Sequence, residues 1–213
     1  MIRIILVDDH AIVRSGYRRL LSAEPDFEVV GEAATVQEAN ALVQRVQPDV
    51  AVVDLSLKGS SGLEAIAGMR VRLPQLRMLV LSMHDGAGHL AQALKAGAQG
   101  YLTKCSEPEE VIDAIRGVMR GRRMLSRDMQ AVLPDGDGDD GVQALKPREF
   151  ELLRLLVHGE SVQDIATAMH LSPKTVLNCL TSIRQKLNAD NDFKLMHLAA
   201  RSGLVEFGTA APA

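Results

Sequence analysis

The first 120 residues alternate short apolar runs, rich in β-branched side chains, with longer stretches in which apolar residues recur at helical spacing. The run Val50–Val53 is apolar at every position, as expected of a strand that is buried on both faces of a sheet. In the first helical stretch, Val13, Tyr17 and Leu20 fall on one face. Strands that alternate with helices through short connections predict an α/β domain with a parallel sheet.

This alternation predicts five strands and five helices. The predicted strands are Ile2–Val7, Phe27–Ala33, Val50–Asp54, Met78–Ser82 and Gly100–Thr103. The predicted helices are His10–Ala23, Val36–Gln47, Leu63–Leu73, Gly88–Ala96 and Glu107–Arg120. In a sheet of this kind, ligand sites lie at the carboxyl ends of the strands, where the winding order reverses.

A segment rich in Gly and Asp, Leu133–Gly141, follows this domain. It can bury little apolar surface and its charges repel one another, so it predicts an exposed linker. A calcium-binding loop is the alternative, because acidic residues alternate with Gly, but the Glu expected at the twelfth loop position is missing. We therefore expect domains at 1–122 and 145–206, a linker at 123–144 and a flexible tail at 207–213.

Four short helices are predicted after the linker: Pro147–His158, Val162–His170, Pro173–Leu187 and Asp192–Arg201. Ser161 can cap the second of them, and Ser172 followed by Pro173 is a strong start signal for the third. Only a short turn around Leu171 separates these two helices, which is the turn length of a helix-turn-helix.

The composition indicates the cellular compartment in which we expect this protein. No apolar run approaches the roughly 20 residues that a membrane-spanning helix needs, and Asp8 and Asp9 interrupt the apolar start. The two cysteines, Cys105 and Cys179, form no metal-ligand pattern and imply no disulfide framework. We therefore expect a cytoplasmic protein that makes no membrane contact.

Three carboxylates follow two of the predicted strands: Asp8 and Asp9 after the first, and Asp54 after the third. If these strands are neighbours, the three side chains converge on one crevice. Clustered negative charges repel unless a cation neutralises them. Because Mg²⁺ prefers a few protein oxygens and several waters, the pattern predicts a Mg²⁺ site.

Two other strand ends supply complementary groups. Ser82 closes the fourth strand with a hydroxyl, and Lys104 follows the fifth with an ammonium group. Together with Asp54 as a carboxylate nucleophile, these groups suit phosphoryl transfer. Each residue alone has an ordinary explanation as a turn, a helix cap or a solvated side chain. Their occurrence at successive strand ends favours a phosphoacceptor site.

These motifs resemble the receiver domain of two-component response regulators over the first 120 residues. The matching segments are Val7-Asp8-Asp9-His10, Val53-Asp54-Leu55, Leu81-Ser82-Met83, Ala96-Gly97-Ala98 and Gly100-Tyr101-Leu102-Thr103-Lys104. The resemblance implies a doubly wound fold whose five parallel strands have the order 2-1-3-4-5. It also implies phosphorylation by a sensor histidine kinase or a phosphotransfer protein.

The same resemblance implies a role for each site residue. Asp54 is the implied phosphoacceptor. Asp9, Asp54 and the carbonyl of Ser56 would hold Mg²⁺, with Asp8 beside them. A second set would respond to the phosphoryl group. Ser82 and Lys104 would contact it, and the Tyr101 side chain would move inward as the domain switches.

Phosphorylation is then expected to favour a homodimer, formed around the fourth helix and the fifth strand near Leu90, Leu94 and Val111.

Two positions depart from the family pattern. The family often has Met-Pro after the phosphoacceptor, whereas this chain has Leu57-Lys58; Gly62 remains, so we expect the loop to keep its turn. A Pro in a cis bond often follows the family's Lys, whereas this chain has Cys105. A cis peptide bond before a residue other than Pro costs roughly 2.5–4 kcal/mol, so the isomer of the Lys104–Cys105 bond stays open.

The third helix of the C-terminal segment is amphipathic. An apolar face is formed by Val176, Leu180, Ile183 and Leu187, and a polar face by Lys174, Asn178, Thr181 and Gln185. Such a polar face can offer donors and acceptors to base edges in a major groove. An ordinary surface helix is the alternative, but the capped helix and short turn before it favour DNA binding. The candidate DNA contacts are Lys174, Thr175, Leu177, Asn178, Thr181, Ser182 and Lys186.

This last third of the chain resembles the LuxR-type helix-turn-helix of NarL/FixJ response regulators. The matching segments are Leu145-Lys146-Pro147-Arg148-Glu149, Ile165-Ala166, Leu171-Ser172-Pro173-Lys174-Thr175-Val176 and Lys186-Leu187. The resemblance implies a transcription factor that binds double-stranded promoter DNA and is not an enzyme.

Charge keeps one alternative open. Residues 145–213 carry eight Lys or Arg and seven Asp or Glu, which is a weak basic footprint for a nucleic-acid-binding domain. A C-terminal domain that binds a protein partner instead of DNA is therefore the alternative. A phosphohydrolase with an Asp nucleophile is remote, because the DxDx[TV] loop of such enzymes is missing around Asp54.

Overall fold

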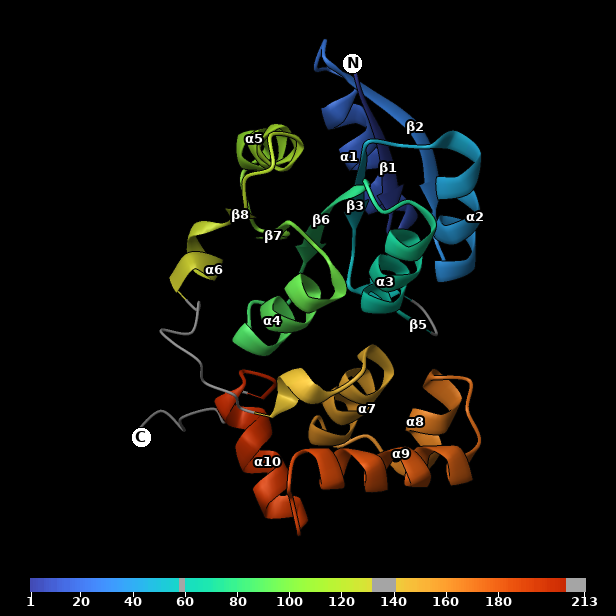
Figure 1. Cartoon of the computed structure of the whole chain (residues 1–213), viewed down its shortest axis with the longest axis vertical. Helices are drawn as coiled ribbons and strands as arrows, with labels where there is room; N and C mark the ends of the chain where they lie inside the picture. Colours follow the sequence, from blue (N-terminus) through green and yellow to red (C-terminus); the bar gives the residue numbers. More distant parts are fainter. Residues whose placement is uncertain (58–59, 132–140, 206–213) are drawn as a thin grey trace. The chain divides into compact units, whose positions relative to one another are not determined.

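The computed structural model describes residues 1–57, 60–131 and 141–205 (Figure 1). They form two compact units, an α/β domain in the N-terminal part and an all-helical domain in the C-terminal part. Among the described residues, no helix is both long and apolar enough to pass through a membrane.

The N-terminal domain is built on one parallel sheet in the order β2-β1-β3-β6-β7-β8. The strands are β1 (Ile2–Val7), β2 (Phe27–Ala33), β3 (Val50–Val53), β6 (Arg77–Ser82), β7 (Gly100–Thr103) and β8 (Met124–Leu125). The first five strands of this order confirm the predicted order 2-1-3-4-5. The sixth, β8, is an addition that the sequence analysis did not foresee.

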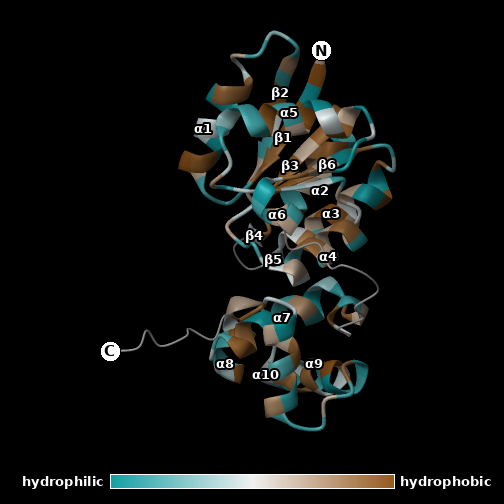
Figure 2. Ribbon diagram, turned by 90° about the vertical axis from the view of Figure 1, so that its left-hand side faces the viewer, coloured by the Kyte–Doolittle hydropathy of each residue, from teal (hydrophilic) through white to brown (hydrophobic). Residues whose placement is uncertain are grey.

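Five helices cover the sheet: α1 (Ala11–Leu21), α2 (Val36–Val46), α3 (Gly62–Arg72), α4 (Ala87–Ala96) and α5 (Pro108–Met119). All five predicted helices are present, with ends shifted by one or two residues. On one face, α1 and α5 pack on alternate strand residues such as Ile4 and Leu6. The intervening residues, Ile5 and Val7, are also buried and point to the opposite face, as in strands covered on both sides. Figure 2 shows the central strands largely in the hydrophobic colour.

One expectation about the surface is wrong. Leu90 and Val111 were expected at a dimer surface, but each is 1 % exposed, and Val111 belongs to the core that α5 forms with the sheet. Helical periodicity places Val111 on the same face as Ile115, and that face is the one that packs inward.

The predicted end of the first domain at residue 122 is too early. β8 pairs with Gly100 and Tyr101 of β7, and Ser126 donates its backbone N–H to the carbonyl of Tyr101. The helix α6 (Arg127–Ala131) follows, with Met129 fully buried. Residues 124–131, which were assigned to the linker, therefore belong to the N-terminal domain.

Residues 132–140 of the predicted linker lie outside the described residues, as do Lys58, residue 206 and the predicted tail at 207–213. The choice between a linker and a calcium-binding loop therefore remains a prediction. Val142–Ala144, expected in the linker, forms a short 3-10 helix, η1, in the C-terminal domain.

The C-terminal domain contains α7 (Pro147–Val157), α8 (Val162–Ala168), α9 (Pro173–Lys186) and α10 (Asp192–Arg201). The predicted caps are confirmed, because the hydroxyl of Ser161 accepts the N–H of Asp164 and that of Ser172 accepts the N–H of Thr175. His170 takes a left-handed conformation (φ 53°) between α8 and α9 and turns the chain there. The result is a helix-turn-helix.

Candidate functional site

Neighbouring strands bring the three predicted carboxylates together at the carboxyl edge of the sheet. β1 pairs with β3 in a register that sets Val7 opposite Val53. The N–H of Asp54 donates to the carbonyl of Val7 at 2.8 Å. Asp8 and Asp9, which follow Val7, and Asp54, which follows Val53, therefore meet at one edge, as predicted.

Lys104 joins this cluster from β7. Its Nζ lies 2.7 Å from Oδ2 of Asp8 and 2.8 Å from Oδ2 of Asp54. The backbone N–H of Lys104 donates to the carbonyl of Ser82 at 2.8 Å, which fixes where the side chain begins. No described peptide bond is cis, so the bond from Lys104 to Cys105, left open by the sequence, is trans.

Burial and pairing oppose each other in this cluster. Burial raises the pKa of Asp54, and the hydrogen bond and charge of Lys104 offset only part of that rise. Burial also lowers the pKa of Lys104, but the hydrogen bonds to Asp54 and Asp8 outweigh it, so this pKa is raised. Lys104 is therefore a fixed positive charge beside two buried carboxylates.

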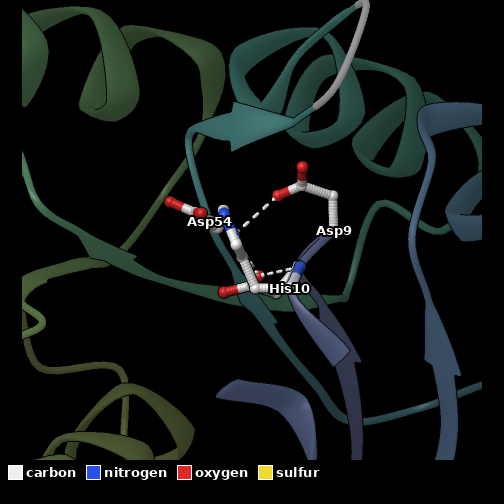
Figure 3. A group of neighbouring side chains, drawn as sticks. Asp9, His10 and Asp54 are labelled. Atoms are coloured by element: carbon white, nitrogen blue, oxygen red, sulfur yellow. Dashed lines mark hydrogen bonds and ion pairs between the residues drawn. The ribbon is translucent and has the colours of Figure 1, made fainter. Parts of the chain in front are cut away.

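Asp9 has a different environment. Its side chain is 6 % exposed, and within the described residues its buried Oδ1 has no hydrogen-bond partner. The Nδ1 of His10 lies 2.9 Å from this oxygen, at ion-pair distance. Ligand atoms from Asp8, Asp9, His10 and Asp54 all lie within 4.8 Å of one another (Figure 3). A buried carboxylate oxygen without a hydrogen bond, beside two other carboxylates, suits a divalent cation.

The loop after Asp54 depends on a glycine. A Cβ on Gly62 would clash with the carbonyl oxygen of Asp54, so only glycine lets the start of α3 approach this closely. The N–H of Ser56 donates to Oδ1 of Asp54 at 3.2 Å, and the N–H of Gly62 donates to the carbonyl of Leu55 at 2.9 Å. The metal-binding role expected of the Ser56 carbonyl stays a prediction.

Ser82 and Tyr101 meet through His84, a residue that the sequence analysis did not single out. The hydroxyl of Ser82, which is fully buried, accepts the N–H of His84 at 3.1 Å. The hydroxyl of Tyr101 donates to the carbonyl of His84 at 2.7 Å. Burial raises the pKa of Tyr101, and the Ser82 hydroxyl opposes part of that rise. Tyr101 therefore points inward and lies beside the Ser82 hydroxyl.

In the C-terminal domain, α9 presents the two faces that its periodicity predicts. Val176, Leu180 and Ile183 are buried, whereas the polar face is exposed at Lys174, Thr175, Asn178 and Thr181. The apolar Leu177 is 53 % exposed beside them. These five candidate DNA contacts are thus accessible on one helix.

Ser182 and Lys186 have partners inside the domain. The Ser182 hydroxyl donates to Oε1 of Glu149 at 3.0 Å, and the Lys186 ammonium group donates to Oε2 of the same carboxylate. The backbone N–H of Lys146 also donates to Oε2 at 2.8 Å. Burial raises the pKa of Glu149, but these hydrogen bonds outweigh it, so the pKa is lowered. The polar groups of Ser182 and Lys186 therefore hold α9 against α7.

Comparisons with known proteins cover both domains. The family profile for the response regulator receiver domain matches residues 4–116. The profile for bacterial regulatory proteins of the luxR family matches residues 143–199. The transcriptional activator protein ExaE of Pseudomonas putida is 37 % identical over 208 residues, which cover 95 % of this chain and 97 % of ExaE.

Two further relatives match nearly the whole chain. The response regulator UvrY of Escherichia coli K12 is 34 % identical, with 96 % of each chain covered. RcsB from Salmonella enterica serovar Typhimurium, solved on promoter rprA with phosphomimetic BeF3−, is 28 % identical with a TM-score of 0.68. That match covers 93 % of this chain and 98 % of RcsB.

Replacement of Lys104 by Met should raise the pKa of Asp54 above its wild-type value, because the ammonium group that stabilises the carboxylate is lost. A raised folded-state pKa means that the folded state binds the proton more tightly, so stability falls as pH rises above the ordinary value of 3.8. The variant should lose about 1–3 kcal/mol at neutral pH. A ¹³C NMR titration of the Asp54 carboxyl measures the first effect and urea unfolding the second.

Lys194→Met is the control. Lys194 lies in the C-terminal domain, where it forms an ion pair of 3.5 Å with the exposed Asp190, four residues before it. An unchanged or lower pKa of Asp54 in the Lys104 variant would contradict the interpretation.

Replacement of Glu149 by Gln should destabilise the C-terminal domain by about 1–3 kcal/mol at neutral pH, because Lys186 loses its carboxylate. The lowered pKa of Glu149 makes its contribution complete above the ordinary value of 4.5. This contribution disappears as pH falls through the folded-state pKa, so the two proteins should converge in acid. Urea unfolding followed by circular dichroism at several pH values measures the difference.

Glu151→Gln removes an i,i+3 pair with Arg154 and should cost under about 0.5 kcal/mol. Equal losses in the two variants would show that Glu149 has no special role.

Proposed function

This chain belongs to the response regulators with a LuxR-type DNA-binding domain, and on that premise we propose that phosphorylation of Asp54 controls how its helix-turn-helix binds promoter DNA. The protein is a transcription regulator of the NarL/FixJ family. The observation that carries the proposal is the double hydrogen bond of Lys104 to Asp8 and Asp54, beside the buried Oδ1 of Asp9, which has no hydrogen bond among the described residues.

Asp54 is the nucleophile in this proposal. One of its carboxylate oxygens attacks the phosphorus of a phosphohistidine or a small acyl phosphate. The bond from phosphorus to the leaving nitrogen or oxygen breaks, and the leaving group keeps the electron pair. Lys104, already 2.8 Å from Asp54, balances charge on the phosphoryl oxygens without having to move far.

Asp8, Asp9 and Asp54 would hold Mg²⁺, together with the carbonyl of Ser56. When bound, Mg²⁺ neutralises charge on the phosphoryl oxygens. The clustered ligand atoms and the buried Oδ1 of Asp9 support this assignment. Without such a cation, Lys104 and His10 are the basic side chains that face these carboxylates in the described part of the chain.

Ser82 and Tyr101 would carry the signal away from Asp54. In our proposal the Ser82 hydroxyl turns toward the phosphoryl group. That movement changes the contacts of Ser82 with the N–H of His84 and with the Tyr101 hydroxyl. Because Tyr101 also bonds to His84, both side chains act on the same loop after β6.

The proposed partners follow from this chemistry. A sensor histidine kinase or phosphotransfer protein supplies the phosphoryl group in the cytoplasm, and α9 contacts double-stranded promoter DNA. Phosphorylation favours a homodimer. RcsB, whose solved complexes include two dimers bound to two parallel DNAs, supports both the DNA and the dimer assignment.

Replacement of Asp54 by Asn should abolish phosphorylation by a small acyl phosphate in Mg²⁺, because the amide keeps the shape but is not a nucleophile. Intact-protein mass spectrometry of the full chain should show one added phosphate in the wild type and none in the variant. Asp113→Asn, an exposed acid on α5, is the matched control and should be phosphorylated like the wild type. Equal phosphate yield in the Asp54 variant would refute the assignment.

Substitutions on the exposed face of α9 should separate base contacts from phosphate contacts. Asn178→Ala should relax specificity at one position, with a loss of roughly 1–3 kcal/mol against the preferred base. Lys174→Ala, near the helix N-terminus, should weaken all DNA sites alike and lower the salt slope by about one. Binding-site selection and salt titration of the phosphorylated protein measure the two effects.

Gln163→Ala on α8 is a control for the loss of a polar side chain outside α9. If the Asn178 and Lys174 variants both bind every sequence as the wild type does, α9 does not contact DNA. The C-terminal domain would then bind a protein partner instead.

A further inference from the structure

The acidic pocket contains a nitrogen donor as well as carboxylates. His10 directly follows the Asp8–Asp9 pair and is the N-cap residue of α1, where its side chain makes no capping hydrogen bond. Its backbone N–H donates to Oδ1 of Asp8 at 2.7 Å, which ties the start of the helix to the pocket. The imidazole is therefore free of a helix-capping role and lies against the carboxylates (Figure 3).

The distances around His10 match those between ligands of one ion. Its Nδ1 lies 2.9 Å from Oδ1 of Asp9 and 3.3 Å from Oδ1 of Asp8. Two ligands that each lie about 2.1 Å from one ion are about 3.0 Å apart at adjacent corners of an octahedron, and about 3.4 Å apart in a tetrahedron. A ligand atom of Asp54 also lies within 4.8 Å of this group.

The buried Oδ1 of Asp9 is a second feature of the pocket that suits a metal ion. The side chain of Asp9 is more than nine-tenths buried. Its Oδ1 has no hydrogen bond among the described residues, although it lies 2.9 Å from Nδ1 of His10. A buried carboxylate oxygen without a hydrogen bond is costly unless a cation completes its environment.

We infer that His10 is a metal ligand in the acidic pocket, and that its nitrogen makes the pocket prefer first-row transition cations such as Ni²⁺, Co²⁺ or Zn²⁺ over Mg²⁺. This inference rests on the proposed function, because it concerns the same pocket. Oxygen ligands suit Mg²⁺, whereas imidazole nitrogen suits the later transition metals, whose affinities rise along the series to Cu²⁺. The His10 side chain is 58 % exposed, so it can turn toward an ion that enters from solvent.

A different role for His10 makes the opposite prediction. A positively charged imidazole could itself neutralise Asp9, in the way that Lys104 neutralises Asp54. In that case His10 competes with every cation, and its removal should strengthen Mg²⁺ and Ni²⁺ binding alike. A ligand role predicts instead that its removal weakens Ni²⁺ binding selectively.

The test uses the full chain, stripped of metal with EDTA and without a phosphate donor. Isothermal titration calorimetry measures Mg²⁺ and Ni²⁺ binding to the wild type and to His10→Ala. We expect the variant to bind Ni²⁺ roughly tenfold or more weakly, and its Mg²⁺ affinity to change by less than about twofold. Circular dichroism checks that the variant is folded.

Three further measurements locate the effect. His158→Ala removes a histidine from the C-terminal domain and should leave Ni²⁺ affinity at the pocket unchanged. In the Asp9→Asn background, His10→Ala should weaken Ni²⁺ binding much less than in the wild type, because ligands of one ion act together. Diamagnetic Zn²⁺ should shift the ring nitrogen resonance of His10 in the ¹⁵N NMR spectrum of the wild type.

Unchanged Ni²⁺ affinity in His10→Ala, or stronger binding of both cations, overturns the inference. Either result leaves the proposed function intact if the wild type is phosphorylated and Asp54→Asn is not. Conversely, phosphorylation of Asp54→Asn would refute the proposed function, whereas the calorimetric result would still decide whether His10 binds metal.

Discussion

The arrangement of charge at the carboxyl edge of the sheet governs the N-terminal domain. Three carboxylates meet there because β1 lies beside β3, and their mutual repulsion in a buried site is unfavourable. Lys104 reaches the same edge from β7 and contacts two of the three. The strand order therefore brings the acidic oxygens together in a buried site, and burial raises the pKa of Asp54 there. The site is built to need a further positive charge.

The C-terminal domain contains a buried carboxylate with a different outcome. Glu149 accepts hydrogen bonds from Ser182, Lys186 and the backbone of Lys146, so both of its oxygens are satisfied within the domain. Its pKa falls, whereas that of Asp54 rises. The carboxylate of Glu149 stabilises a helix pair, whereas the buried Oδ1 of Asp9 has no hydrogen bond among the described residues. This contrast separates a structural ionic cluster from the one that we propose to be functional.

The residues after β6 and β7 connect the acidic pocket to the rest of the N-terminal domain. The carbonyl of His84 accepts a hydrogen bond from the Tyr101 hydroxyl, and the N–H of His84 donates to the Ser82 hydroxyl. Tyr101 lies on β7, the strand that also pairs with β8 and precedes Lys104. The proposed movement of Ser82 would therefore act on a short chain of hydrogen bonds rather than on the whole sheet, which suits a two-state response.

The sequence alone determined the five longer strands and the five helices that alternate with them. The resemblance to receiver domains supplied the strand order, which brings Asp8, Asp9, Asp54 and Lys104 to one edge of the sheet. The sequence also determined the caps and the buried face of α9, which depend on local periodicity and chain chemistry. β8 and α6 were missed because a two-residue strand and a five-residue helix have no detectable period.

Only the tertiary structure decided how side chains pair. It set His10 beside Asp9, His84 between Ser82 and Tyr101, and Ser182 and Lys186 against Glu149, 33 and 37 residues away in the chain. Such contacts join segments that are distant in sequence, or depend on which way one side chain turns. Residue type and spacing do not encode them, because they arise when whole elements pack against one another.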